Sequence, residues 1–139
     1  MEEKYLIELL KLANKAAKKN EIPISALIVN KNKVIAKAYN TRNKKNITTD
    51  HAEILAIQRA NKKLKSWRLN NCSLYVTIEP CDMCKNVIRE SRIDEVYYLL
   101  PRLEYKKIYN KTKFYQINNN PKINEIYTII KDNFWKNIR

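Results

Sequence analysis

Apolar residues recur at helical spacing over the first part of the chain. They share one face of a predicted helix that ends near Lys19, and they are Leu6, Leu9, Leu10, Ala13, Ala16 and Ala17. Two segments rich in β-branched residues, 24–29 and 34–39, predict strands, and the polar residues 30–33 between them predict a hairpin. Asparagine in this turn tolerates the positive φ angle that such a turn requires.

The middle of the chain alternates between predicted helices and strands. In order, the pattern gives a polar loop at 41–49, a helix from 51 to about 65, a strand at 74–78, a helix from 81 to about 90 and a strand at 95–100. Pro80 ends the first of these strands, because proline favours extended geometry before it and the first turn of a helix after it.

The C-terminal part is less regular. The segment 101–121 has no clear pattern, a last strand is predicted near 123–127, and a short helix follows through Phe134 and Trp135. Strands that alternate with helices predict the α/β class, here a three-layer α/β/α sandwich with a mixed central sheet.

Length and composition favour one folded domain. The chain of 139 residues is long enough to bury a core, and no linker or repeat divides it, so we expect a single domain over 1–139. Apolar runs stay below the roughly 18 residues of a membrane span. The N-terminal segment does not resemble a signal peptide. We therefore expect a cytoplasmic protein with no membrane contact.

The chain is strongly basic, with a formal net charge of +14. Such an excess attracts polyanions, of which nucleic acid is the commonest. The chain also has 0 glycines, and glycine codons are GC-rich, so an AT-rich genome that inflates lysine and asparagine explains the charge equally well. The charge supports an RNA substrate without establishing one.

A Cys-x-x-Cys pair, Cys81 and Cys84, begins the predicted helix that follows Pro80. On a helix this spacing places both thiols on one face, and a helix N-terminus favours the thiolate form that binds metal. By itself the pair fits zinc or redox chemistry, although redox chemistry also expects a thioredoxin-like context. His51, the only histidine, supplies a third candidate ligand.

Three nitrogen and sulfur ligands leave the fourth position of a tetrahedral Zn²⁺ open, which is typical of catalytic zinc. Such a zinc lowers the pKa of a water molecule, so that hydroxide can attack a carbon that bears an aromatic amine. A carboxylate must then move protons to the ring and to the leaving ammonia, and Glu53 lies two residues after His51. Alternatively, Asp50 and Glu53 form a variant of the helix capping box.

These residues resemble the zinc nucleobase deaminases and, among them, the bacterial tRNA adenosine deaminases. The resemblance extends from about Tyr5 to Val96. The segments that carry it are Glu21-Ile22-Pro23, Tyr39-Asn40, His51-Ala52-Glu53, Trp67-Arg68-Leu69, Leu74 to Cys84 and Ser91-Arg92-Ile93. The segment from Leu74 to Cys84 is specific for the superfamily, and the segments around Pro23 and Asn40 narrow it to the tRNA enzymes.

The resemblance implies a cytidine deaminase-like fold and hydrolysis of adenosine to inosine at the wobble position of a tRNA anticodon. It implies Zn²⁺ as the cofactor, held by His51, Cys81 and Cys84, with Glu53 as the proton shuttle. It also implies a homodimer that binds the anticodon arm and flips the target base into the zinc pocket.

The same resemblance assigns residues to substrate binding. Asn40 is similar to a side chain that hydrogen-bonds the flipped base, with turn chemistry as the alternative. Ala52 and Pro80, next to the ligands, belong to the pocket. In the family a C-terminal helix meets the anticodon loop. The residues of this chain that correspond to it are Phe134, Trp135, Lys136 and Arg139. Core packing is the alternative for the two aromatic residues.

The chain also departs from the family pattern. Leu99 to Glu104 replace a glycine-flanked segment with Asp and Lys, so an RNA-contacting element is altered or lost. Ser25 stands where glycine is usual, Lys85-Asn86 replace small residues, and the last helix is short. None of these changes touches zinc or proton transfer. They bear on the choice of substrate.

Two rival functions stay open. A free nucleobase or nucleotide deaminase of the guanine or cytosine type would have the same zinc site, although the positive charge and the Phe134-Trp135-Lys136 end favour RNA. A nucleic-acid-binding module with a structural zinc would need a fourth ligand. Cys72 is the only spare soft ligand and is more typical of a small buried residue.

Overall fold

The computed structural model describes residues 3–102, 112–117 and 120–138. It divides the chain into two compact units, Met1–Glu104 and Tyr105–Arg139. The prediction of one domain over the whole chain stays a prediction. Among the described residues, no helix combines the length and the apolar character of a membrane span.

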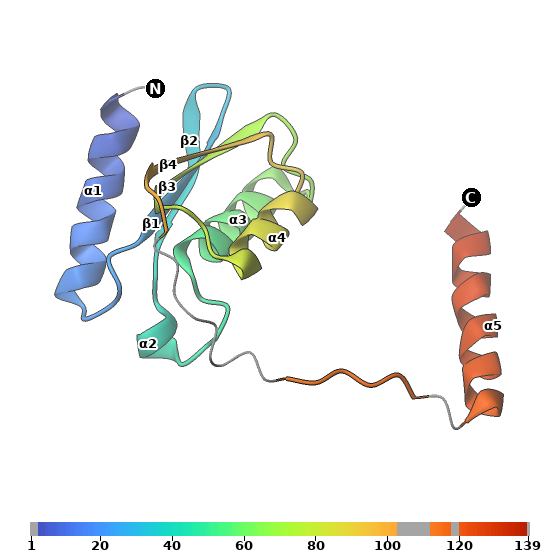
Figure 1. The fold of residues 1–139 in the computed structure, drawn as a ribbon. Coiled ribbons are helices and arrows are strands. Elements are labelled where there is room, and N and C mark those ends of the chain that lie inside the picture. The colour runs from blue at the N-terminus through green and yellow to red at the C-terminus, as the bar shows by residue number, and fades with distance from the viewer. Residues whose placement is uncertain (1–2, 103–111, 118–119, 139) are drawn as a thin grey trace. The chain divides into compact units, whose positions relative to one another are not determined.

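A four-stranded mixed sheet in the order β2-β1-β3-β4 forms the centre of the first unit (Figure 1). Its strands are β1 (Ser25–Asn30), β2 (Lys33–Tyr39), β3 (Cys72–Ile78) and β4 (Glu95–Leu100). β1 is antiparallel to both β2 and β3, whereas β3 and β4 are parallel. Parallel strands require a crossover, which the helix between β3 and β4 provides.

Helices cover both faces of this sheet, which confirms the three-layer α/β/α prediction (Figure 1). α1 (Glu3–Lys18) lies on one face, and α3 (Ala52–Leu64) and α4 (Asp82–Glu90) lie on the other. Alternate residues of β1 serve the two layers, with Ile28 in the core under α3 and Leu27 in the core under α1.

The buried face of α1 differs from the predicted one. The buried residues of this helix are Tyr5, Leu9, Leu12 and Ala16, which are spaced by three or four positions. Leu10 is 58% exposed, and Ala17 is exposed as well. Adjacent helical positions differ by about 100°, so a face that carries Leu9 and Ala16 turns Leu10 and Ala17 toward solvent. Because Tyr5 was not counted as a core residue, the predicted stripe was rotated.

The predicted hairpin is present, and its turn is made without glycine. Lys31 and Asn32 have φ angles of 51° and 63°, as a two-residue turn between paired strands requires. Across the described residues, seven non-glycine positions have positive φ, and these are Asn20, Lys31, Asn32, Asn46, Lys65, Asn71 and Arg92.

Two elements correct the sequence-based prediction. A short helix, α2 (Arg42–Lys45), lies inside the predicted loop 41–49. The predicted strand near 123–127 is wrong, because these residues belong to α5 (Pro121–Ile138). Isoleucines favour strands locally, but apolar residues at 123, 126, 130 and 134 have helical spacing.

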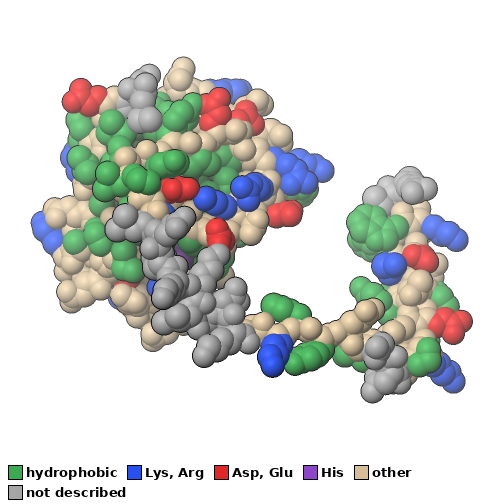
Figure 2. Space-filling view, viewed as in Figure 1, with side chains coloured by type: hydrophobic (Ala, Val, Ile, Leu, Met, Phe, Trp, Pro, Cys, Tyr) green, Lys and Arg blue, Asp and Glu red, His purple; other side chains and the backbone are tan. Residues whose placement is uncertain are grey.

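Strand β4 carries apolar side chains that the first unit leaves open to solvent. Leu100 is 62% exposed, Tyr98 46% and Leu99 39%. In the view of Figure 2, hydrophobic side chains gather in a band across this part of the unit. The stacked rings of Tyr75 and Tyr97, with centroids 5.1 Å apart, connect β3 to β4 within the sheet.

Candidate active site

The three predicted metal ligands come together at the N-terminal ends of α3 and α4. His51 is the residue before α3, Cys81 is the residue before α4, and Cys84 lies in the first turn of α4. One donor atom from each residue lies within 4.8 Å of the other two. The Nδ1 atom of His51 is 3.4 Å from Cys84 Sγ and 3.7 Å from Cys81 Sγ.

The electrostatics of this group suit a cation. Hydrogen bonding from the Cys84 thiol, with further help from His51, lowers the pKa of Cys81 to about 3. The same contact with Cys81, together with burial, raises the pKa of Cys84. Without a cation only one of the two thiols ionises readily. A soft divalent ion that replaces both protons would relieve this competition, and one nitrogen with two sulfurs is a donor set typical of zinc.

Glu53 lies in the first turn of α3, and its side chain is only 2% exposed. It contacts Cys84, and burial is the main cause that raises the pKa of its carboxyl. Its Oε1 atom is buried with no hydrogen-bond partner among the described residues. His51, the N-cap residue of α3, makes no side-chain cap hydrogen bond. An unpartnered buried oxygen of this kind is available to a bound molecule, and the roles of Glu53 as proton shuttle or as cap stay predictions.

Asn40 is 3% exposed and fixes the turn that leads from β2 into α2. Its Oδ1 atom accepts a hydrogen bond from the backbone N–H of Arg42 at 2.8 Å. Its own N–H donates to the carbonyl of Ile24 at 3.0 Å. The structure therefore assigns Asn40 the turn chemistry that the sequence left as an alternative. Its role in binding a base stays a prediction.

Two residues near the site were missed from the sequence. Glu21, which is 6% exposed, accepts hydrogen bonds from the backbone N–H groups of Asn43 at 3.0 Å and Lys44 at 2.8 Å. The Nη1 atom of Arg42 lies 3.2 Å from Nε2 of His51. A carboxylate four residues before a largely buried strand was the available signal for Glu21. No local signal pointed to Arg42.

Glu79 connects the segment after β4 to the start of α4 through hydrogen bonds and an ion pair. Its carboxylate pairs with Lys85 at 2.9 Å and accepts from the N–H of Arg102 at 3.3 Å. The Nε atom of Arg102 also donates to the Glu79 carbonyl at 3.1 Å. The hydrogen bond from Lys85, followed by that from Arg102, lowers the pKa of Glu79. Lys85 and Arg102, both departures from the family pattern, therefore converge beside Cys81.

The remaining predicted residues fall in different places. Ala52 and Pro80 are buried next to ligand residues. Phe134, Trp135 and Lys136 lie on α5 in the second unit, where the two aromatic side chains are each 59% exposed. Arg139 lies outside the described residues. The roles of these residues in substrate binding stay predictions.

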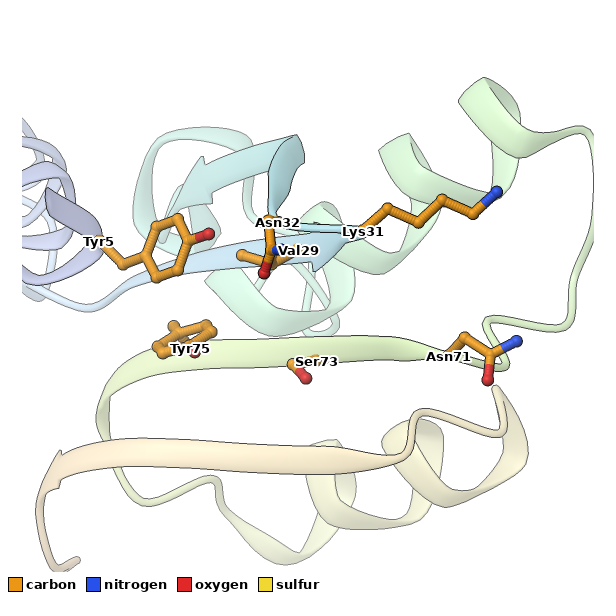
Figure 3. A pocket seen from close by; sticks show the side chains of 7 residues that line it. All are labelled: Tyr5, Val29, Lys31, Asn32, Asn71, Ser73 and Tyr75. Carbon is orange, nitrogen blue, oxygen red and sulfur yellow. The ribbon is translucent and has the colours of Figure 1, made fainter. Parts of the chain in front are cut away.

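A separate hollow lies at the ends of β1 and β3 that are far from the metal ligands (Figure 3). Its lining includes Tyr5, Lys31, Asn71 and Ser73. The buried hydroxyl of Tyr5 has no hydrogen-bond partner among the described residues. Because the metal ligands lie beyond the opposite ends of these strands, this hollow does not belong to the candidate active site.

Comparisons with known proteins point in one direction. The model of the MafB19-like deaminase family matches residues 2–139. The tRNA-specific adenosine deaminase of Bacillus subtilis (strain 168) is 42% identical over 97 residues, which cover 70% of this chain. The chain spans 60% of that relative's length.

Two solved structures are also similar. One, from work on A-to-I editing by tRNA:A34 deaminases at the wobble position, has a TM-score of 0.70 and 39% identity, covering 73% of this chain and 79% of its own. The guanine deaminase of Bacillus subtilis has a TM-score of 0.78 and 25% identity, covering 94% of this chain and 95% of its own.

Proposed function

The chain belongs to the MafB19-like deaminase family, and we propose that it hydrolyses adenosine to inosine at the wobble position of a tRNA anticodon. One observation carries the proposal. The buried carboxylate of Glu53, with an unpartnered oxygen, lies against three donor atoms that fall within 4.8 Å of one another. The 42% identity to a tRNA-specific adenosine deaminase supports the choice of substrate.

We propose that His51, Cys81 and Cys84 hold Zn²⁺ through Nδ1 and the two sulfurs. When bound, zinc would lower the pKa of a water molecule, so that hydroxide is available at neutral pH. The N-terminal ends of α3 and α4 orient the ligands, and their backbone dipoles stabilise thiolate. Cys72 is buried on β3 and is not among the three clustered donor residues of the described chain. The cluster therefore leaves a coordination position for water, which favours a catalytic over a structural zinc.

Glu53 moves the protons of the reaction. Its carboxylate takes one proton from the attacking water and delivers it to N1 of the adenine ring, while the C6–O bond forms. It then transfers the second proton of that water to the amino group, the C6–N bond breaks, and ammonia leaves. Burial of the carboxylate excludes bulk water, which would otherwise compete as a proton acceptor.

The residues proposed to bind the substrate follow from the resemblance to the tRNA enzymes. Asn40 hydrogen-bonds the flipped base, and Ala52 and Pro80 form the walls beside the ligands. Phe134 and Trp135 stack against bases of the loop, and Lys136 and Arg139 contact its phosphates. We further propose that the chain acts as a homodimer and folds as one functional domain. A cytoplasmic location is expected for an enzyme that acts on tRNA.

Guanine deamination is the second candidate. It is favoured by the similarity to the guanine deaminase of Bacillus subtilis, which extends over 94% of this chain, beyond the part matched by the tRNA enzymes. The zinc chemistry and the role of Glu53 would be the same. Only the rim of the pocket and the second unit would differ.

A comparison of substrates in parallel assays separates the two functions. The zinc-loaded protein is incubated in parallel with tRNA that carries adenosine at the wobble position, with free adenosine, and with guanine, adenine and cytosine. We expect inosine in the tRNA and little turnover of free bases. Efficient release of ammonia from guanine, with tRNA unchanged, would replace the RNA assignment by the second candidate.

A further inference from the structure

Six cationic side chains occupy two segments that are distant in the sequence, the end of α1 and the helix α2. All six are exposed, and they are Lys15, Lys18, Lys19, Arg42, Lys44 and Lys45. We call this group the basic edge.

A buried carboxylate holds the two segments together. Glu21, two residues after the end of the first segment, accepts hydrogen bonds from the backbone of Asn43 and Lys44. On the other side, the Nζ atom of Lys19 donates to the Tyr39 hydroxyl at 2.9 Å. That hydrogen bond is the main cause that lowers the pKa of Tyr39, and the charges of Lys15 and Lys44 act in the same direction. The cations of both segments therefore surround one point on the surface.

The positive charge of the basic edge has no exposed acidic neighbour on its own segments. Between residues 9 and 51 the chain has two carboxylates, Glu21 and Asp50. They are 6% and 7% exposed, and both accept internal hydrogen bonds. Two lysines outside the basic edge form ion pairs, Lys37 with Glu8 and Lys85 with Glu79. Within the described residues, none of the six cations forms an ion pair.

The basic edge reaches the candidate active site. Its member Arg42 approaches the ring of His51, with Nη1 at 3.2 Å from Nε2. The hollow beside it is lined by Arg42, Asn43, Asn46 and Thr48, which offer donors and no carboxylate. A polyanion that lies along this edge would therefore pass directly beside the metal ligands.

We propose that the basic edge binds the phosphate backbone of the RNA next to the target nucleotide. The inference rests on the proposed function, and it adds a phosphate contact on the first unit to those proposed for Lys136 and Arg139. Lysine and arginine that neutralise phosphates release counterions, which makes binding favourable and strongly dependent on salt. A flipped base requires that the flanking backbone be held, and the edge supplies this hold beside the zinc site.

The test compares two triple variants with the same change in net charge. The edge variant carries Lys15→Gln, Lys19→Gln and Lys44→Gln. The control variant carries Lys33→Gln, Lys62→Gln and Lys63→Gln, three exposed lysines outside the basic edge. Arg42 is left unchanged because it contacts a ligand residue. Binding of a fluorescein-labelled anticodon stem-loop RNA is measured by anisotropy at several salt concentrations, together with zinc content and inosine formation.

We expect the edge variant to keep its zinc and to lose RNA affinity. The slope of log affinity against log salt should become shallower by about 2 to 3, and the control should change by less than about 1. Equal losses in both variants would show that only total charge matters and would overturn the inference. Retained RNA binding, with loss of binding to anionic lipid vesicles instead, would overturn it in favour of a membrane.

The readouts separate this inference from the proposed function. If the parent binds the RNA through the basic edge but forms no inosine, the assignment of wobble adenosine as the substrate fails and the surface stands. If inosine forms while the edge variant binds as well as the control, the surface is wrong and the function stands.

Discussion

The two units of the chain differ in how they treat apolar residues. In the first unit, Leu9, Leu27, Leu69 and Leu74 are at most 1% exposed, and the candidate active site is built on this core. In the second unit, the large apolar side chains of α5 between Ile123 and Trp135 are between 48% and 64% exposed, with Ile126 and Tyr127 at the two limits. The first unit packs its apolar side chains in a core, whereas α5 exposes its apolar side chains to solvent.

This difference separates two requirements of the proposed reaction. Metal ligands and a proton shuttle must be fixed to within a fraction of an ångström, which a close-packed core provides. A surface that receives a large substrate needs exposed aromatic and cationic groups, and Phe134, Trp135 and Lys136 are of this kind. We expect substitutions in the first unit to affect metal, stability and turnover, and substitutions in α5 to affect RNA-dependent activity.

The largest effect is expected for Cys84→Ala. The variant should lose its zinc, its activity and part of its stability, because two remaining ligands cannot complete the shell. Cys72→Ala is the matched control, since Cys72 is also a buried cysteine but lies outside the ligand group. Zinc per chain is measured by elemental analysis, and stability by urea unfolding. One zinc per chain in Cys84→Ala would contradict the ligand assignment.

Glu53→Gln should keep zinc and fold while turnover falls by about 10²-fold to 10⁴-fold, because only the proton transfer is removed. Glu8→Gln, which changes a half-buried carboxylate of the same unit that pairs with Lys37 away from the ligands, should leave turnover unchanged. A capping role for Glu53 predicts a different result, a loss of roughly 1 kcal/mol in stability with activity kept. Turnover within a few-fold of the parent would therefore support the cap and exclude the shuttle.

Removal of residues 133–139 should abolish deamination of tRNA while zinc stays bound, because the truncation takes away Phe134 and Trp135 but no ligand. Zinc content, thermal unfolding and inosine formation are measured on the same preparation. If the shortened chain deaminates tRNA normally, the second unit has no part in substrate binding, and the contrast between the units loses its functional meaning.

The smallest effects test the contrast in packing. Leu74→Ala in the core should lower the free energy of unfolding by about 2–5 kcal/mol, because a cavity replaces buried methyl groups. Ile130→Ala on α5, where the side chain is 60% exposed, should change it by less than about 0.5 kcal/mol. Urea unfolding of both variants gives the comparison. A cost above about 2 kcal/mol for Ile130→Ala would mean that this side chain is buried in solution, which would contradict the contrast in packing.

Much of the sheet could be predicted because the signal for a strand is local. Strand β4 was predicted with its bounds, and β1, β2 and β3 were predicted to within two residues. The three metal ligands could be named from their order and spacing, although only the fold shows that His51 meets the two cysteines some 30 positions later.

The failures have physical causes. Helix α2 could not be predicted, because its first N–H groups are satisfied by Asn40 and by Glu21 from another segment, and its own sequence Arg42–Lys45 has no helical pattern. The strand predicted near 123–127 failed because β-branched residues were weighed over their helical spacing. In α1, one uncounted aromatic residue, Tyr5, was enough to rotate the predicted buried face.

The positive φ angles of this chain have a consequence for its evolution. With 0 glycines, all seven left-handed positions of the described chain are held by larger residues, four of them asparagine. For Lys31, Lys65 and Arg92, which lack the short side chain that makes this conformation tolerable, each position costs about 1–2 kcal/mol. A lineage with this composition carries conformational strain in its turns, so a single change to glycine at such a turn offers it a short mutational path to higher thermal tolerance, without any change in core or active site.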